Sequence, residues 1–413
     1  MKLVGSVLVL LFSAIFFSCK DNSKERMEDM YERSGDIEFA EEQLKLFFET
    51  MPEAIANEPE EQRIQRERAE RGPLVSPRSM RDGKLFMVPS RDWTSGFFPG
   101  MMWFMYEFTD DDFWYRKARE HTAHIEREKT NDGTHDMGFK IYCSFGNGYR
   151  ITGDESYSDI MIESARTLIT RYNENVGCIR SWDFARDRWD FPVIIDNMMN
   201  LELLFWATRE TGDPVFYNIA VNHANATLRD FFREDNSSYH VIDYNPETGE
   251  IQNRHTHQGY THESAWARGQ AWGLYGFTMS YRETGIKAYL EQAKKIADFI
   301  LNHPNLPDDM VPYWDYNAPN IPDEPRDVSA ATIMSSALFE LSTFVPEMSD
   351  YYFNTASRIL ENVSSNYRSE PGGNKGFLLG HGTGHFPGNH EIDEPLIYAD
   401  YYFLEAIKRM KSK

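Results

Sequence analysis

Residues 211–217 read Thr-Gly-Asp-Pro-Val-Phe-Tyr, and they join an apolar helical run to an amphipathic one. Related junctions read Thr-Gly-Asp-Glu-Ser-Tyr at residues 152–157 and Thr-Gly-Ile-Lys-Ala-Tyr at residues 284–289, with weaker copies near residues 108 and 344. The Thr-Gly pair ends the first helix, because glycine tolerates the left-handed conformation of a C-cap. Asp154 or Asp213 then begins the next helix as its N-cap. This internal repeat predicts a chain of helical hairpins.

The two helices of each hairpin differ in pattern. Three first helices are apolar or small almost all round, which indicates burial on several sides: residues 194–209, 265–282 and 328–344. Their partners, such as residues 214–233 and 287–302, are amphipathic and are expected outside. Inner and outer helices that alternate along the chain predict an all-α fold, an (α/α)6 barrel. An open helical solenoid is the structural alternative, and no run of alternating strands supports a separate β domain.

The composition excludes several classes of protein. The chain has 413 residues and a formal net charge of −22, from 43 basic and 65 acidic residues. Its 28 Phe, 22 Tyr and 9 Trp would be unfavourable to leave in water, so disorder is excluded as the main state. A negatively charged chain repels phosphate at long range, so we expect no nucleic-acid partner. Three cysteines are too few for a disulfide scaffold, and we expect Cys143 and Cys178 to be structural.

The N-terminus reads as an export signal. Lys2 precedes an uncharged, mostly apolar run at residues 4–17, which is too short to span a bilayer stably. Ser18-Cys19 follows, and a cysteine at this place resembles a bacterial lipoprotein cleavage site. We therefore expect a lipid anchor on Cys19, and through it attachment to the outer membrane, at the cell surface or in the periplasm. An ordinary cleaved signal peptide is the alternative.

These features divide the chain into three parts. Residues 1–18 are predicted to be a lipoprotein signal peptide, and the polar, charged residues 19–35 a tether. Residues 36–413 are predicted to form the (α/α)6 barrel domain. The lipid anchor is the only membrane contact that we expect.

Polar and aromatic residues cluster where the inner helices begin. The clusters are Asp-Trp-Thr-Ser-Gly at 92–96, His-Asp-Met-Gly at 135–138, Asp-Asn at 196–197, His-Gln-Gly-Tyr at 257–260, Trp-Ala-Arg-Gly-Gln at 266–270, and Glu394 with Asp400 on the first turns of the last helix. In a barrel of hairpins the inner-helix N-termini share one rim, so these segments are expected to converge on one pocket. Unpaired backbone N–H groups and helix dipoles would favour an anionic ligand there.

Two carboxylates in these clusters suit acid–base chemistry. An aspartate at a helix start is most often an N-cap, which is the alternative for each. Asp196 nevertheless stands in a strongly apolar stretch, where burial would raise its pKa toward neutrality. Asp136 follows a histidine in a loop, where polar function often concentrates. The neighbouring tryptophans make a sugar-processing cleft plausible, since aromatic faces stack on pyranose rings: Trp93, Trp182, Trp266 and Trp272.

The His-rich segment Asn-Arg-His-Thr-His at residues 253–257 could suggest a metal site. We favour a hydrogen-bonding loop, because no carboxylate completes a familiar ligand spacing. We therefore expect neither a metal nor an organic cofactor.

The stretch KLFMVPSRDWTSGFFPG at residues 84–100 resembles the opening motif of the unsaturated glucuronyl hydrolases, glycoside hydrolase family 88. Three further blocks match that family in order: HDMGF at 135–139, IDNMMN at 195–200 and SAWARGQAW at 264–272. The resemblance covers roughly residues 36–411.

The resemblance implies an (α/α)6 barrel and a glycosidase with unusual chemistry. The family acts on lyase-generated oligosaccharides that end in a 4,5-unsaturated uronic acid at the non-reducing end. It hydrates the C4=C5 vinyl ether, and the hemiketal that forms collapses to release the sugar. By resemblance, Asp196 is the general acid/base and Asp136 the second essential carboxylate. The positions expected to line the subsite are Trp93, His135, Trp182, His240, Gln258, Trp266 and Arg268, with Arg268 a donor to anionic or hydroxyl groups.

Two other functions stay open at this point. The related unsaturated rhamnogalacturonyl hydrolases share the barrel and the chemistry, and a similar Trp-Ala-Arg-Gly-Gln block occurs in them. A non-catalytic glycan-binding lipoprotein would explain the anchor and the tryptophans, but not Asp196 in its apolar setting. Heparin, chondroitin, hyaluronan and ulvan are all compatible as the parent polysaccharide.

Overall fold

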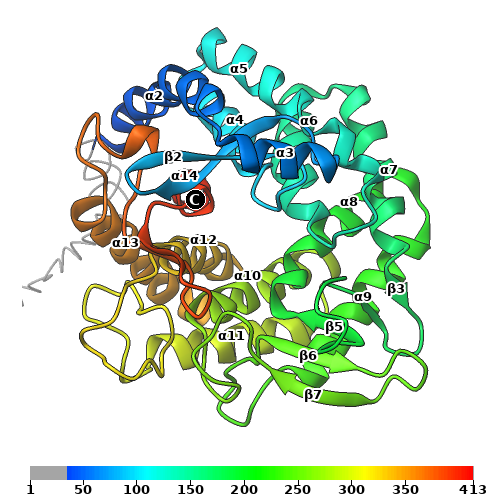
Figure 1. The fold of residues 1–413 in the computed structure, drawn as a ribbon. Helices are drawn as coiled ribbons and strands as arrows, with labels where there is room; N and C mark the ends of the chain where they lie inside the picture. The colour runs from blue at the N-terminus through cyan, green and yellow to red at the C-terminus, as the bar shows by residue number, and fades with distance from the viewer. Residues whose placement is uncertain (1–34, 413) are drawn as a thin grey trace, which may run out of the picture. The chain divides into compact units, whose positions relative to one another are not determined.

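The computed structural model describes residues 35–412, and the predictions for the signal peptide, Cys19 and nearly all of the tether lie outside them. From residue 37 onward the chain forms one compact unit, a closed ring of helical hairpins (Figure 1). Six inner segments occur in this part: α4 (Phe97–Thr109), the π-helix Gly138–Gly146 with α6 (Asn147–Thr152), the 3₁₀ segment Ile195–Asn200 with α8 (Leu201–Thr211), α10 (Ala267–Thr284), α12 (Val328–Phe344) and α14 (Ile397–Lys411).

An outer helix accompanies each inner segment. The outer helices are α2 (Asp36–Ala56), α5 (Asp112–Ala123), α7 (Glu155–Ile169), α9 (Pro214–Asp230), α11 (Lys287–Leu301) and α13 (Ser349–Asn366). A short helix, α3 (Glu60–Arg68), follows α2. The ring closes where α14 packs on α4, with the Tyr401 ring 5.2 Å from Phe97 and 5.0 Å from Phe104. The predicted (α/α)6 barrel is therefore confirmed, and the open solenoid is wrong.

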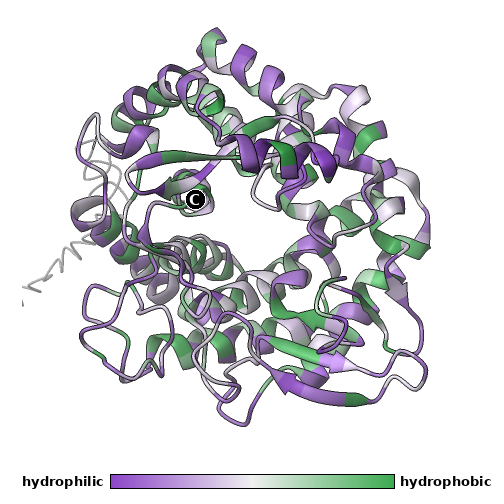
Figure 2. Ribbon diagram, viewed as in Figure 1, coloured by the Kyte–Doolittle hydropathy of each residue, from purple (hydrophilic) through white to green (hydrophobic). Residues whose placement is uncertain are grey.

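The junctions have the predicted caps. Gly153, Gly212 and Gly285 end their helices in the left-handed conformation, with φ of 66°, 70° and 68°. Asp154 and Asp213 each accept a hydrogen bond from the backbone two residues on. The inner helices α10 and α12 are buried on all sides over most of their length, whereas polar and apolar residues alternate along the outer helices (Figure 2). Cys143 and Cys178 are buried and free, as expected.

Nine short strands, which the sequence analysis did not predict, complete the described part of the chain. They form the hairpins β1–β2 (Leu74–Arg81, Lys84–Pro89), β3–β4 (Tyr172–Asn173, Cys178–Ile179) and β8–β9 (Gly382–His385, His390–Glu394), and the antiparallel sheet β5–β6–β7 (Phe191–Ile194, Val241–Tyr244, Ile251–His255). Every strand lies in a connection from an outer helix to the next inner segment. These long connections therefore gather at the rim where the inner segments begin, while the short Thr-Gly junctions lie at the other rim.

Two predicted boundaries need correction. Glu394 ends strand β9 and does not lie on α14, which begins at Ile397. Residue 194 belongs to β5, so the inner segment after it begins with a 3₁₀ turn. The predicted helix after His135 is a π-helix, and its Gly138 N–H donates to Oδ1 of Asn200 on the neighbouring inner segment at 2.8 Å. Among residues 35–412, no helix is both long and apolar enough to cross a bilayer.

Candidate active site

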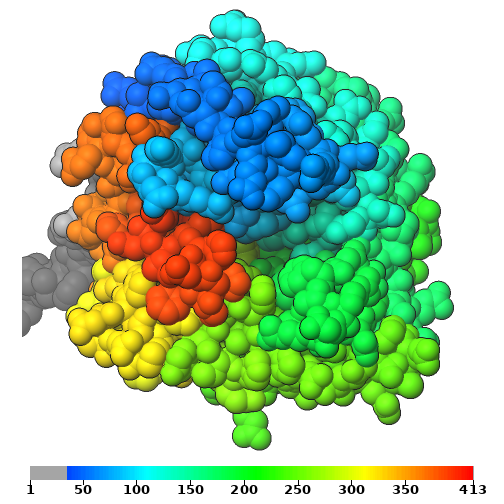
Figure 3. Space-filling view, in the orientation of Figure 1, coloured from blue at the N-terminus to red at the C-terminus, as the bar shows by residue number. Residues whose placement is uncertain are grey.

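A cavity of about 200 Å³ opens at the rim where the inner segments begin. In the space-filling view a hollow lies between the blue N-terminal segments, the red β8–β9 hairpin and the green segment beside β5 (Figure 3). Seven of the nine residues predicted for catalysis and substrate binding line this cavity: Trp93, His135, Asp136, Trp182, Asp196, Gln258 and Arg268. The other two, His240 and Trp266, are buried directly behind it. The predicted convergence on one pocket is confirmed for five of the six clusters, whereas Glu394 and Asp400 do not line the cavity.

Asp196 lies on the 3₁₀ turn at the start of its inner segment. The N-cap of that segment is Ile194 and not Asp196, so the N-cap alternative fails. Burial raises the pKa of Asp196 to about 7; the Asp136 carboxylate adds to the rise, and the Arg268 guanidinium opposes it. Within the described chain, Asp196 Oδ2 is buried without a hydrogen-bond partner. A carboxyl group with this pKa can both give and take a proton near neutral pH.

His240 faces Asp196 in a fixed tautomer. Its Nδ1 accepts hydrogen bonds from the backbone N–H groups of His257 and Gln258, each at 3.1 Å. The ring proton therefore lies on Nε2, which is 3.9 Å from Asp196 Oδ2. Burial holds the pKa of His240 well below its usual value, so the ring is neutral. Trp266 packs against the imidazole with ring centroids 4.5 Å apart, which makes it a support for His240 and not part of the cavity wall.

Asp136 forms a pair with His135. His135 Nδ1 donates to the Ser181 carbonyl at 2.7 Å, and Nε2 lies 3.1 Å from Asp136 Oδ1. Because a carbonyl only accepts, Nδ1 carries the ring proton. Thr134 Oγ1 donates to the other carboxylate oxygen at 2.9 Å. Burial lowers the pKa of His135, and the Asp136 carboxylate opposes this.

Arg268 has fewer donors free to bind a ligand than predicted. Its Nη1 donates to Asp327 Oδ2 at 2.6 Å and to the Thr383 carbonyl at 2.7 Å, and its Nη2 donates to the Gly384 carbonyl. Asp327 therefore compensates the charge, and only the donors that these contacts leave free can reach a ligand. The guanidinium nevertheless lies close enough to Asp196 to lower its pKa.

Three acidic or aromatic side chains expected at the pocket serve the framework instead. Asp92 is bound by Arg78 and by the Thr94 backbone and hydroxyl. Asp400 is fully buried and accepts the backbone N–H groups at positions 378 and 379, because the connection before α14 needs an internal acceptor. Trp272 is fully buried against Phe139 and Tyr402, so it belongs to the barrel core.

The structure adds residues to the cavity wall that the sequence analysis missed: Arg78, Phe139, Phe184, Ile194, Gly384, His385, Glu391 and Tyr398. Arg78 on β1 donates to Glu391 on β9 through Nε at 2.6 Å and Nη2 at 3.1 Å. This pair ties the N-terminal hairpin to the C-terminal one. No local sequence pattern marks two residues so distant in the chain.

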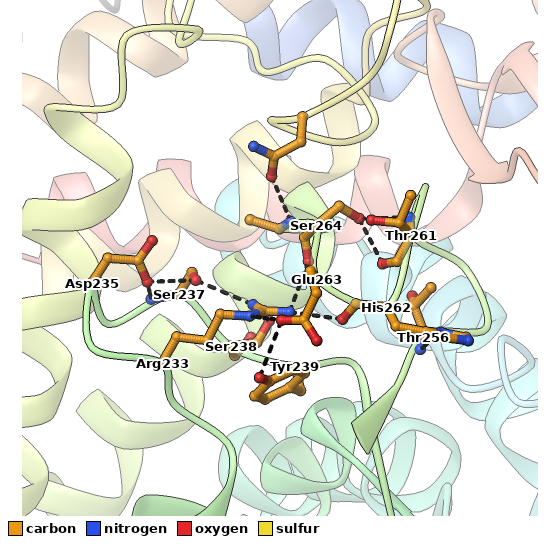
Figure 4. Close-up of polar contacts among 12 residues, drawn as sticks. Arg233, Asp235, Ser237, Ser238, Tyr239, Thr256, Thr261, His262, Glu263 and Ser264 are labelled. Atoms are coloured by element: carbon orange, nitrogen blue, oxygen red, sulfur yellow. Dashed lines mark hydrogen bonds and ion pairs between the residues drawn. The ribbon is translucent and has the colours of Figure 1, made fainter. Parts of the chain in front are cut away.

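An arginine-centred network holds the loop that carries His257 and Gln258 (Figure 4). Arg233 donates to the His262 carbonyl at 2.9 Å and to the Ser264 carbonyl at 3.3 Å, and it also binds the Ser238 carbonyl. Gln258 in turn donates to the Gly384 carbonyl at 3.1 Å. The loop is thus fixed at its outer end by Arg233 and at the cavity by Gln258.

Comparisons with known proteins agree with this geometry. The model of Glycosyl Hydrolase Family 88 matches residues 75–318. An unsaturated glucuronyl hydrolase of Formosa agariphila is 55% identical over 327 residues, which cover 79% of this chain and 81% of that protein. A crystal structure of an unsaturated glucuronyl hydrolase specific for heparin superposes with a TM-score of 0.82 and 45% identity, covering 91% of this chain and 97% of that one.

A further solved structure contains a ligand. It is a variant of the Streptococcus agalactiae unsaturated glucuronyl hydrolase complexed with dGlcA-GalNAc6S, and it superposes with a TM-score of 0.71 at 28% identity. The superposition covers 94% of this chain and 92% of that one.

Proposed function

The chain belongs to glycoside hydrolase family 88, and we propose that it removes the 4,5-unsaturated glucuronyl residue from the non-reducing end of lyase-generated oligosaccharides. The observation that carries this proposal is Asp196, a buried carboxyl group with a pKa of about 7 that faces a cavity of about 200 Å³. A cavity of this size suits one terminal sugar ring.

Asp196 is proposed as the general acid and base. In its protonated form it gives a proton to C4 of the C4=C5 vinyl ether, and positive charge develops at C5 and the ring oxygen. The carboxylate that remains then takes a proton from a water molecule that attacks C5. The resulting hemiketal opens at the bond between C5 and the ring oxygen. This leaves a hemiacetal at C1, which releases the leaving sugar as an alcohol.

The neighbours of Asp196 have proposed supporting roles. The Nε2–H of His240 points toward Asp196 and can donate to the carboxylate form or to the attacking water. Asp136, paired with His135, can accept hydrogen bonds from ring hydroxyls. In solved variants of the Streptococcus agalactiae enzyme, two aspartates are replaced singly by asparagine, and they are separated by as many residues as Asp136 and Asp196. That spacing supports the choice of this pair.

The ring itself is proposed to lie among Trp93, Trp182 and Gln258. Trp93 packs against Tyr398 at 4.9 Å, and Trp182 packs on the buried cluster of Trp189, Ile194 and Val241, so both indoles are firmly held. Rigid aromatic walls suit a sugar ring, because they lose little conformational freedom on binding.

The two other functions are not favoured. The relatives that match along most of this chain are unsaturated glucuronyl hydrolases and unsaturated chondroitin disaccharide hydrolases. A glycan-binding protein without activity would gain nothing from a buried acid, which is costly to keep.

The experiment that tests the function uses a panel of unsaturated disaccharides made by heparin, chondroitin, hyaluronan and ulvan lyases. Hydration removes the conjugated double bond, so loss of ultraviolet absorbance reports turnover. Activity on at least one member is the expected result. No loss of absorbance with any member would overturn the proposal, and the preferred member identifies the parent polysaccharide.

We also propose that the protein is exported and attached to the outer membrane through a lipid on Cys19. The support is the apolar run of residues 4–17 that ends at Ser18-Cys19, followed by a polar segment long enough to separate the barrel from a membrane.

A further inference from the structure

Phe184 is an exposed aromatic side chain at the mouth of the cavity. It is 49% exposed, more than any other large apolar side chain in the described residues. It nevertheless belongs to the cavity wall, and it lies in the connection between β4 and β5, beyond Trp182. An exposed apolar ring at the edge of a cavity offers a surface that a bound ligand can cover.

The connection that carries Phe184 is firmly built. Asp183 pairs with Arg180 and accepts hydrogen bonds from Arg171 Nη1 at 2.7 Å and Arg186 Nη2 at 3.0 Å. Three arginines around one carboxylate fix the backbone just before Phe184.

The backbone just after Phe184 is held as well. The carbonyl of Ala185 accepts the N–H groups of Arg188 and Trp189, each at 2.9 Å, and the Trp189 side chain is buried. Ala185 has a φ of +50°, a conformation that ordinary residues rarely adopt and that is often retained where function requires it. The position of Phe184 is therefore set on both sides.

Other rings support Phe184 from within. Its centroid lies 5.0 Å from that of Trp182 and 5.7 Å from that of His257. Trp182 and His257 also line the cavity, and their rings lie 5.2 Å apart. The three rings form a continuous aromatic surface that runs from the cavity wall to the outside, and Phe184 is its outer end.

The size of the cavity shows which part of a substrate would reach that end. Pockets that enclose a whole drug-sized ligand typically measure roughly 300–1,000 Å³. The cavity here measures about 200 Å³, which leaves room for the terminal uronyl ring but not for the sugar attached to it. That second sugar must lie at the mouth, beside Phe184.

We propose that Phe184 is the stacking platform for the first sugar of the leaving group. The inference rests on the proposed function and adds a residue that selects the leaving group. A pyranose presents an apolar face of C–H groups, and this face packs on the exposed Phe184 ring while Trp182 and His257 hold the ring from behind.

The test compares two substrates that share the unsaturated uronyl ring: the preferred disaccharide and the methyl glycoside of the same unsaturated uronic acid. Loss of one aromatic contact is expected to lower kcat/KM of Phe184→Ala for the disaccharide by about three- to tenfold, mainly through KM. The methyl glycoside lacks the second sugar, so kcat/KM of Phe184→Ala for this substrate is expected to differ from the wild-type value by less than about twofold. Phe184→Tyr keeps the ring face and is expected to retain the wild-type preference for the disaccharide.

Tyr351→Ala is the matched control, because Tyr351 is a 44% exposed aromatic residue on the outer helix α13. The ratio of kcat/KM for the disaccharide to kcat/KM for the methyl glycoside should be the same in Tyr351→Ala as in the wild type. If Phe184→Ala lowers kcat/KM equally for both substrates, or if Phe184→Tyr behaves like Phe184→Ala, the proposed stacking role of Phe184 is wrong. If the wild-type enzyme hydrolyses neither substrate, the proposed function itself fails, and the two failures are thus distinct.

Discussion

At the scale of single residues, the chemistry depends on an acid kept where its charge is unfavourable. Asp196 lies near a second carboxylate, Asp136, and the Oδ2 atom of Asp196 is buried. Arg268 is the compensating cation, but Asp327 already shares its charge. The result is a carboxyl group that is half protonated at about pH 7, which suits an acid that must become a base within one turnover.

The first prediction concerns turnover. Asp196→Asn keeps the size of the side chain but cannot exchange a proton, so kcat should fall by about 10²–10⁴-fold, the usual contribution of positioned proton transfer. In the wild type, kcat/KM should decline as pH rises through about 7, because the acid form of Asp196 is lost. Steady-state rates across pH 5–9 check both points. A variant that turns over at nearly the wild-type rate would contradict the mechanism.

The second prediction concerns stability. The pKa of Asp196 is about 7 in the folded protein and near 3.8 when unfolded, so the folded state binds the proton more tightly. Stability is therefore lost as pH rises from about 4 through 7, by on the order of 2–4 kcal/mol. Asp196→Asn removes this loss and should have a higher Tm than the wild type at pH 8, with a smaller difference at pH 5.

Melting curves at both pH values provide the measurement. Asp154→Asn is the matched control: Asp154 is a partly exposed N-cap, and hydrogen bonds from Ser156 lower its pKa, which is the opposite direction. It should gain no stability at pH 8. A Tm for Asp196→Asn below that of the wild type at pH 8 would show that this carboxylate stabilises the fold.

At the scale of elements, the site depends on how closely α4 approaches the π-helix. Gly96 precedes α4, and a Cβ atom there would overlap the carbonyl oxygens of Phe139 and Lys140. Trp93 and Asp136 stand beside these two elements and line the cavity. A shift between the elements would therefore move a proposed binding residue, Trp93, relative to a proposed catalytic one, Asp136.

The third prediction follows from that contact. Gly96→Ala should cost about 1–3 kcal/mol of stability through overpacking, and it should also lower kcat/KM. Gly212→Ala is the control, because Gly212 has open space around it at the opposite rim and a φ of +70°. It should lose about 1 kcal/mol from backbone strain and keep the wild-type kcat/KM per folded molecule. Equal activity of the two variants would contradict the role given to the α4 contact.

Local sequence was informative about helices and their ends, and much less about the rim. The Thr-Gly-Asp junctions predicted the caps at Gly153 and Gly212 because a cap is a contact between near neighbours. The strands of the long connections are only two to eight residues long and pair across loops, so their signal is weak. The pair of Arg78 with Glu391 joins opposite ends of the chain and has no local signal at all.

At the scale of the whole molecule, the two rims of the barrel have different tasks. The long connections with strands, the cavity and the proposed catalytic pair lie at the rim where the inner segments begin. The opposite rim has the short junctions and charged pairs such as Arg282 with Glu340 and Arg409 with Glu340.

The motifs of residues 92–96, 135–138 and 196–197 could be placed at one rim from sequence because ring symmetry brings all inner N-termini together. Phe184 and His385 could not, since they belong to connections whose path the repeat does not determine.

The last prediction concerns where the whole molecule resides. If Cys19 is lipidated, the protein should fractionate with membranes in its native host and partition into detergent, although no described helix in residues 35–412 can span a bilayer. Cys19→Ala removes the acceptor for the lipid. Residues 19–35 contain no other cysteine that could carry the lipid in its place. The variant should therefore appear in the soluble fraction or remain unprocessed.

Cys143→Ala is the control, because this buried thiol lies in the barrel and its replacement should leave fractionation unchanged. Membrane association of Cys19→Ala equal to that of the wild type, with the signal peptide removed, would contradict the anchor.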